Sequence, residues 1–128
     1  MGNGTSIGRV RGLGAAHHGA HHWLVQRFTA IGNVVLMSWL LVSLVLMGDF
    51  GHSNVAKWLS QPLPATAMIL LVTSLFWHAR LGLQVLIEDY LHEAGTKFAA
   101  IAALNLVTIG GGAFGIFSVA ALAFGRTV

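Results

Sequence analysis

The sequence predicts an all-α integral membrane protein with three transmembrane helices. Its composition and its three long apolar segments both indicate this fold class. Hydrophobic residues make up 55% of the 128 residues and charged residues only 9%, whereas a soluble domain carries roughly 25% charged residues. Because so few charges cannot cover the apolar surface in water, the excess must face lipid or another protein.

Three apolar segments are long enough to cross a bilayer, at residues 28–47, 65–87 and 98–124. A hydrocarbon core of about 30 Å requires roughly 20 residues of helix. Within lipid every backbone N–H and C=O must be bonded inside the segment, so all three spans are predicted to be helical.

Polar and turn-forming residues separate these spans. Residues 48–54 form a turn-rich stretch after the first span, and residues 88–97 lie between the second and third spans. Pro62 and Pro64 stand just before the second span, where proline is compatible with the start of a helix.

Residues 1–27 are predicted to form a cytoplasmic N-terminal tail, and residues 28–128 the three-helix anchor domain. The tail lacks the apolar core of a cleaved signal peptide. The cytoplasmic side carries the excess of Lys and Arg, which predicts a cytoplasmic N-terminus and second loop and an external C-terminus. The residues on the predicted cytoplasmic side are Arg9, Arg11, Arg27 and Lys97, whereas Lys57 and Arg126 lie on the external side.

Two classes of function are excluded by composition. The chain has no cysteine, so it holds no disulfide, thiolate metal site or iron–sulfur cluster of its own. Its net charge of +3 comes from scattered residues without a basic run or a nucleic-acid motif, so no nucleic acid is predicted as a partner.

His78 is the main candidate for chemistry, since an ionisable side chain inside a membrane is costly and marks a functional site by default. On a helix, Ser74, His78, Gly82, Val85 and Asp89 share one face. Asp89 would lie roughly 16 Å along the axis from His78, at the membrane surface.

A buried neutral imidazole can ligate iron, zinc or copper, relay protons, or bond to a neighbouring helix. Gly82, one turn away, leaves room for a flat bulky group, and no second His or Cys lies deep in a span. These features favour haem over the other readings. A six-coordinate b-type haem would take its second axial ligand from another subunit, which makes this chain part of a heteromeric helix bundle.

The pattern of His78, Gly82 and Asp89-Tyr90 resembles the small cytochrome b membrane anchor of succinate dehydrogenase. Residues 19–31, a short polar segment leading to Arg27 and the first span, also resemble that family's opening. The resemblance covers most of the chain, but only the stretch from His78 to Tyr90 is diagnostic.

For haem, the resemblance implies that His78 is an axial ligand of haem b and that the larger cytochrome b anchor subunit supplies the other ligand. Ser74, Gly82 and Val85 would pack against the haem.

For the substrate, the resemblance implies a site for ubiquinone or menaquinone near the cytoplasmic surface. Tyr90 would donate a hydrogen bond to a quinone carbonyl, and Asp89 would orient the site or serve proton uptake. Arg27 would neutralise a haem propionate or line the quinone pocket. A flavoprotein and an iron–sulfur subunit would carry out succinate oxidation and pass electrons through this complex to the quinone pool.

Alternative assignments remain open from the residues alone. The chain could be the anchor of a related fumarate reductase, another membrane cytochrome b, a purely structural anchor without haem, or a transporter fragment. Tyr90 could be an ordinary interfacial tyrosine. The bacterial inner membrane is the predicted location, in preference to the mitochondrial inner membrane.

Three further features have no assigned chemistry. Gly111 and Gly115 form a small-xxx-small pair that either lets helices approach closely or reflects the general abundance of glycine in membrane helices. Arg80 lies about 200° around its helix from His78, and could pair with lipid, with Asn105 or with a partner subunit.

Four histidines gather in the tail, His17, His18, His21 and His22. They suggest either a zinc or copper site or, in preference, a tail that docks on a soluble subunit.

Overall fold

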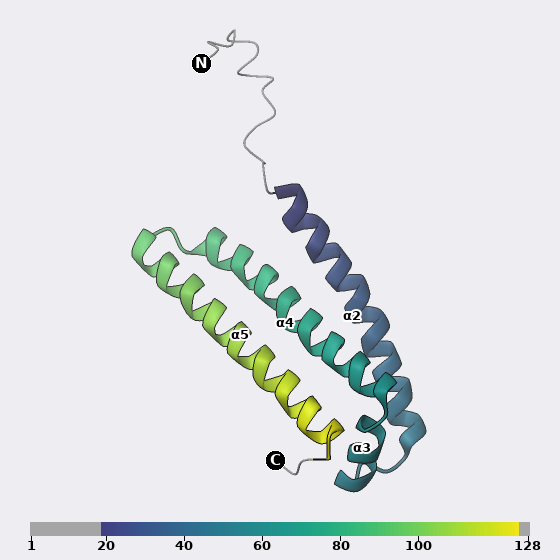
Figure 1. Ribbon diagram of the computed structural model, residues 1–128. Helices are drawn as coiled ribbons and strands as arrows, with labels where there is room; N and C mark the ends of the chain where they lie inside the picture. The colour runs from purple at the N-terminus through teal and green to yellow at the C-terminus, as the bar shows by residue number, and fades with distance from the viewer. Residues whose placement is uncertain (1–18, 126–128) are drawn as a thin grey trace, which may run out of the picture.

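The computed structural model describes residues 19–125, and every regular element within that range is a helix. The helices are α2 (Gly19–Met47), α3 (His52–Leu59), α4 (Pro62–Tyr90) and α5 (Ala94–Ala123) (Figure 1). The three long helices are each long and apolar enough to cross a membrane. The predicted helical fold with three spans is therefore confirmed.

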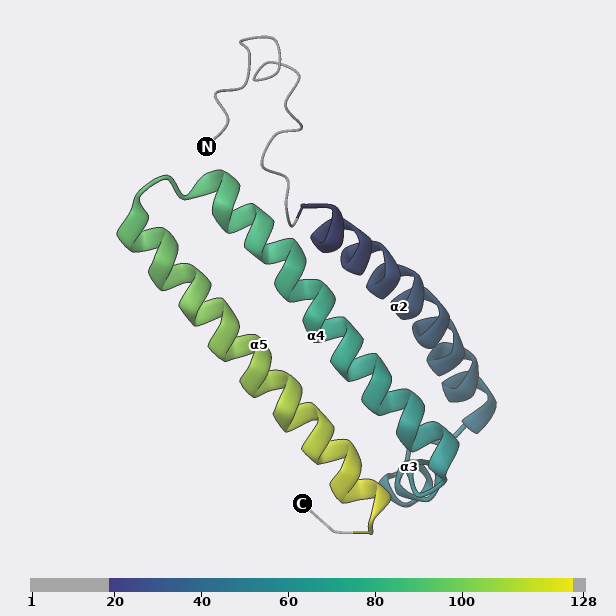
Figure 2. The same ribbon diagram turned by 45° about the horizontal axis from the view of Figure 1, so that its top comes forward.

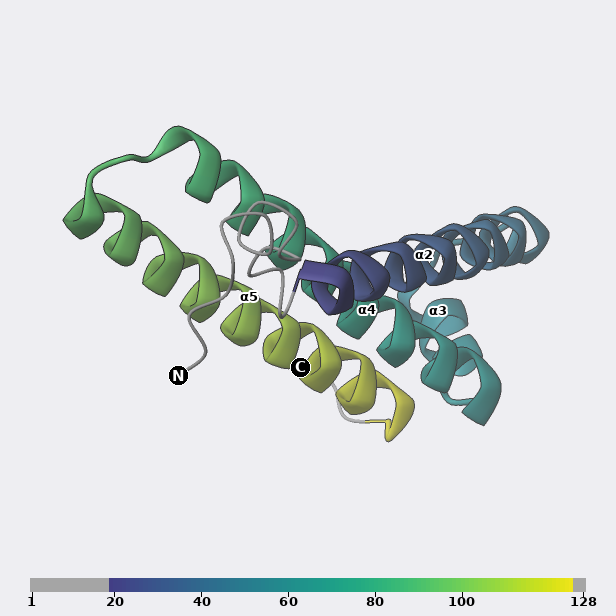
Figure 3. The same ribbon diagram turned by 90° about the horizontal axis from the view of Figure 1, so that it is seen from above.

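The central element of the bundle is α4. Figures 1 and 2 show it lying between α2 and α5, with the start of α2, the end of α4 and the start of α5 at the same end of the molecule. Seen from above, α5 runs alongside α4 while α2 crosses it obliquely (Figure 3). Each spanning helix is thus antiparallel to the one that follows it in the sequence.

The spanning helices are longer than the apolar segments that predict them. α4 contains 29 residues, or about 43 Å at 1.5 Å per residue, which exceeds a hydrocarbon core of about 30 Å. Most of the polar stretch predicted at 88–97 is helical, because α4 continues to Tyr90 and α5 begins at Ala94. The helices are therefore long enough for their ends to reach the headgroup region.

A short helix, α3, which the sequence patterns did not predict, begins within the turn-rich segment after the first span and continues to Leu59. Gly48 ends α2 with a φ of 69°, a left-handed conformation that favours glycine. The Asp49 carboxylate accepts a hydrogen bond from the Asn54 side chain at 2.6 Å, which ties the loop to the first turn of α3. The Trp58 ring stacks on Trp39 of α2, with ring centroids 5.5 Å apart.

Two glycines of α5 allow it to lie close against α4. A Cβ atom added to Gly111 would come within 2.6 Å of the Phe76 ring, and one added to Gly115 would come within 2.9 Å of Val72 Cγ1. Both distances are shorter than real Cβ atoms tolerate. Of the two readings of this glycine pair, the structure supports close helix packing.

Enlarging Gly115 should separate α5 from α4. We expect Gly115→Leu to destabilise the packed helices by about 1–3 kcal/mol, because overpacking forces side chains and backbone to shift. Thermal denaturation of the purified protein complex in detergent, followed by tryptophan fluorescence, measures this loss as a lower midpoint temperature. Gly110→Leu is the matched control, since a Cβ atom there meets nothing within 4 Å; an equal effect of both substitutions would refute this packing.

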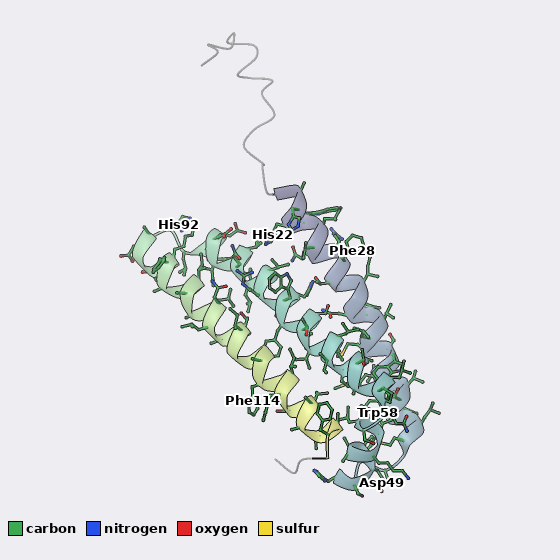
Figure 4. All side chains as sticks on the ribbon, viewed as in Figure 1. His22, Phe28, Asp49, Trp58, His92 and Phe114 are labelled. Atoms are coloured by element: carbon green, nitrogen blue, oxygen red, sulfur yellow. The ribbon has the colours of Figure 1, made fainter. Side chains whose placement is uncertain are left out.

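Much of the apolar surface has no partner among residues 19–125. Phe28 on α2 and Phe114 on α5 are 67% and 70% exposed and point away from the bundle (Figure 4). Large side chains along the rest of α2 are similarly exposed, among them Ile31, Val34, Val35, Leu41, Val42, Val45 and Leu46. In water such a surface would be strongly unfavourable, so lipid or other subunits must cover it.

Candidate functional site

The site is organised around His78, which lies close to the middle of its helix. The midpoint of Pro62–Tyr90 is residue 76, so His78 is about 3 Å from it along the axis. Its ring is half-buried and faces α2, where Nδ1 lies 3.0 Å from the hydroxyl oxygen of Thr29. The imidazole is therefore held by a polar contact between two spanning helices.

Further polar residues accompany this contact where α2 meets α4. We call this region the α2–α4 seam and define it by Gln26, Thr29, Asn33, Ser74, His78 and Gly82. The Ser74 hydroxyl donates to the backbone carbonyl of Thr29 at 3.4 Å. Asn33 is buried, and its Oδ1 atom has no hydrogen-bond partner among the described residues. The seam is thus polar in a region where polar groups are expensive to leave unbonded.

The position of Gly82 fits a bulky neighbour beside His78. A Cβ atom added there would meet only the Gln26 side-chain nitrogen, at 3.9 Å, which is ordinary contact. Apart from Gln26, which has a flexible side chain, no neighbouring helix or side chain of the described residues comes within 4 Å of that position. The imidazole of His78 can supply a nitrogen ligand for iron, and Gly82 has no Cβ one turn away. Together these two features fit a planar haem.

The three other residues predicted on this face behave differently from one another. Ser74 turns toward α2 and is half-buried, whereas Val85 is 38% exposed. Asp89 is exposed near the end of α4. The face shared by these residues therefore begins against α2 and turns outward as α4 diverges from α2 (Figure 3).

The predicted quinone residues Tyr90, Asp89 and Arg27 do not bond to one another, and Arg27 lies nearer the level of His78 than that of Tyr90, since it is two residues from Thr29, which contacts His78. Tyr90 is the last residue of α4 and is 77% exposed. The Arg27 guanidinium lies over the ring of Trp23 on its own helix, 5.2 Å from the ring centroid. Within residues 19–125, no hydrogen bond or ion pair joins Arg27 to Asp89 or Tyr90. Their phenol, carboxylate and guanidinium groups remain accessible to a ligand or another chain.

Arg80 points to the opposite side of α4, as its helical angle predicts. Its Nε donates to the Asn105 side-chain oxygen at 2.6 Å, and its guanidinium lies 5.3 Å from the Trp77 ring centroid. Of the three pairings left open for Arg80, the structure contains the one with Asn105. An open groove of about 580 Å³ lies beside this pair between α4 and α5.

The histidines of the N-terminal tail are only partly covered, because His17 and His18 lie outside the described residues. His21 and His22 fall in the first turns of α2. In the part of the chain that the structure describes, no three His, Cys, Asp or Glu side chains form a group able to hold a metal ion.

Neither Thr29 nor Asn33 was singled out by the sequence patterns. A signal for both was present, since Gln26, Thr29 and Asn33 recur at helical spacing along one face of an otherwise apolar span. Polar residues at that spacing indicate a face turned toward another helix rather than toward lipid.

Comparison with known proteins identified a family and several relatives. Residues 1–112 match the family of the succinate dehydrogenase/fumarate reductase transmembrane subunit. The chain is similar to the succinate dehydrogenase hydrophobic membrane anchor subunit of Rickettsia bellii, with 36% identity over 82% of this chain and 84% of the relative. It is also similar to the succinate dehydrogenase membrane anchor subunit of Reclinomonas americana, with 31% identity over 71% and 78% of the two chains.

A third relative, the hydrophobic membrane anchor subunit of Paracoccus denitrificans succinate dehydrogenase, is 27% identical over 72% of this chain and 70% of its own length. No solved structure matched the chain.

Proposed function

Because this chain belongs to the succinate dehydrogenase/fumarate reductase transmembrane subunit family and is a membrane-anchor subunit of succinate dehydrogenase, we propose that it ligates a b-type haem through His78. We further propose that it contributes Tyr90 to a site where the membrane quinone is reduced. Electrons from succinate oxidation would reach ubiquinone or menaquinone through the complex that this subunit anchors.

The observation that carries the haem proposal is the half-buried imidazole of His78 near the middle of α4, one turn from Gly82. An imidazole nitrogen is a common ligand of haem iron, and a bound haem would supply a one-electron carrier within the bilayer. The residues of this chain would hold it by one bond from His78 and by packing against Ser74, Gly82 and Val85.

The second axial ligand would come from another polypeptide. Among the described residues, the remaining histidines lie at helix ends or in connections, at His21, His22, His52 and His92. None of these positions is at the depth of His78. The larger cytochrome b anchor subunit is therefore the proposed source of the other ligand, and the exposed apolar surface of α2 is available to contact it.

The proposed quinone site follows from where protons and charge are needed. Quinone reduction consumes two protons, which must come from the aqueous side. Tyr90, at the exposed end of α4, can donate its phenol hydrogen to a quinone carbonyl, and this bond strengthens as negative charge develops on the oxygen. Asp89, exposed beside Tyr90, can exchange protons with water, and Arg27, exposed on α2 two residues from Thr29, can attract an anionic group.

The orientation in the membrane follows from the positive residues. Arg27 lies in the half of α2 nearer to the end of the bundle that carries Tyr90, and Lys97 lies in the first turn of α5 at that end, while Lys57 lies at the opposite end, on α3. From the excess of Lys and Arg we infer that the Tyr90 end faces the cytoplasm. The flavoprotein and iron–sulfur subunits would dock on that side. A bacterial inner membrane fits the Rickettsia and Paracoccus relatives.

Purification of the complex through an affinity tag on the C-terminus tests this function. We expect the flavoprotein, the iron–sulfur subunit and the larger anchor to co-purify with the chain in detergent, together with the absorption bands of haem b. Recovery of the four subunits without any haem would overturn the haem proposal and leave a purely structural anchor. Recovery of the chain without a flavoprotein would contradict the proposed electron path.

A further inference from the structure

We propose that Thr29 is a positioning residue for His78, one that fixes which ring nitrogen carries the proton. Its hydroxyl holds the imidazole with hydrogen on Nδ1, so that the lone pair of Nε2 is free to bind iron. This inference rests on the proposed function, since it assigns a role toward the haem that His78 would ligate.

Counting donors and acceptors around the Thr29 hydroxyl supports the assignment. The hydroxyl oxygen lies 2.9 Å from the Val25 carbonyl, 3.1 Å from the Gln26 carbonyl and 3.0 Å from His78 Nδ1. A hydroxyl has one hydrogen to donate and can accept through its lone pairs, whereas a carbonyl can only accept. The single hydrogen must therefore go either to a backbone carbonyl or to the histidine ring.

The two choices give different histidine tautomers. If the hydroxyl donates to a carbonyl, its lone pair faces the ring and Nδ1–H donates to it, which makes two hydrogen bonds. If the hydroxyl donates to the ring, Nδ1 is an acceptor, Nε2 carries the proton, and the carbonyl contact is lost. The first choice makes one more bond, and in lipid a missing bond has no water to replace it.

Threonine in membrane helices commonly donates to the carbonyl four residues earlier. Thr108 on α5 has the same local geometry, with its hydroxyl oxygen 2.8 Å from the Leu104 carbonyl and 3.2 Å from that of Asn105. Both threonines thus adopt the usual backbone-bonded arrangement, and Thr29 differs because a histidine from a neighbouring helix approaches its free lone pair.

The position of Thr29 relative to α4 is itself held by a second contact. The Ser74 hydroxyl, one turn before His78 on α4, bonds to the Thr29 backbone carbonyl. The side chain and the backbone of Thr29 therefore contact two successive turns of α4, at His78 and at Ser74. This arrangement fixes the height and rotation of α2 that bring the hydroxyl to Nδ1.

A hydrogen-bonded Nδ1–H has a measurable consequence for the metal. Metal-ligating histidines typically donate their other N–H to an acceptor, which fixes the ring orientation and makes the ligand more basic; removing the acceptor typically costs about 10–100-fold in metal affinity. A more basic ligand favours ferric over ferrous iron. Loss of the Thr29 hydroxyl should accordingly raise the haem midpoint potential and loosen the haem.

Three variants of the purified complex test this role. Thr29→Val keeps the shape and removes the hydroxyl, Thr29→Ser keeps the hydroxyl, and Thr108→Val removes an equivalent backbone-bonded hydroxyl that bonds to no histidine among the described residues. We expect Thr29→Val alone to release haem about tenfold or more readily, to have a higher midpoint potential and to show altered electron paramagnetic resonance g-values. The Thr29→Ser variant should show the same haem retention, midpoint potential and g-values as the unmodified complex.

A fourth variant, His78→Ala, separates failure of this inference from failure of the proposed function. If His78→Ala loses haem while Thr29→Val matches Thr108→Val in potential, g-values and haem retention, Thr29 has no positioning role and the haem assignment stands. If His78→Ala keeps the haem unchanged, the haem assignment fails and the role of Thr29 fails with it.

Discussion

The His78→Ala variant of the assembled complex should lack the haem b bands altogether. Alanine supplies no nitrogen to the iron, and within the described residues no other histidine of the chain lies at that depth in the bundle. A haem held by a single axial bond from the partner subunit would be lost during purification. The reduced-minus-oxidised difference spectrum, divided by the amount of complex, measures the remaining haem.

His92→Ala is the control for this substitution. His92 is exposed in the connection between α4 and α5 (Figure 4), so its removal should leave the haem content unchanged. Equal haem in the His78→Ala and unmodified complexes, with all subunits assembled, would show that another residue ligates the iron.

The Tyr90→Phe variant should reduce quinone slowly while oxidising succinate at the normal rate. Phenylalanine retains the ring and removes only the hydroxyl, and because Tyr90 is 77% exposed, removal of the hydroxyl leaves no buried group of the described residues without a partner. Loss of one hydrogen-bond donor to a developing oxyanion typically costs about 10²–10³ in rate. The measurement compares succinate-driven reduction of quinone with reduction of a soluble artificial acceptor.

The soluble acceptor serves as the internal control, since it takes electrons from the soluble subunits and needs no quinone site. Equal rates of quinone reduction in the variant and the unmodified complex would return Tyr90 to the role of an ordinary interfacial tyrosine. A matching fall in both rates would indicate damage to the assembly rather than loss of a donor to the quinone.

Hydropathy was sufficient to predict the spans, because the cost of unbonded backbone in lipid allows few alternatives to a helix. Hydropathy was not sufficient to predict the residues at which these helices end. The hydrogen bonds of α4 continue past the apolar residues to Tyr90, since a polar side chain does not stop a helix at the membrane surface. The helix α3 was missed because it has only eight residues, His52–Leu59, of which half are polar, and because it follows a run of turn-forming residues.

The contacts of the site depend on how the helices are rotated against each other, which a single span does not reveal. The angle between Arg80 and His78 was readable from one helix, and α4 indeed directs them to α5 and α2 respectively. The hydrogen-bonding partner of His78 could not be predicted from one helix, because Thr29 is remote in sequence and an isolated threonine is common in membrane helices. Only the spacing of Gln26, Thr29 and Asn33 carried that information.

An experimental structure of the purified complex is the most direct test of haem ligation by this chain. We predict a haem iron within bonding distance of His78 Nε2, a histidine of the larger anchor subunit on the opposite face, and Nδ1 on the Thr29 hydroxyl. An iron ligated entirely by other residues, or a His78 ring turned to lipid with side chains filling the space over Gly82, would contradict it.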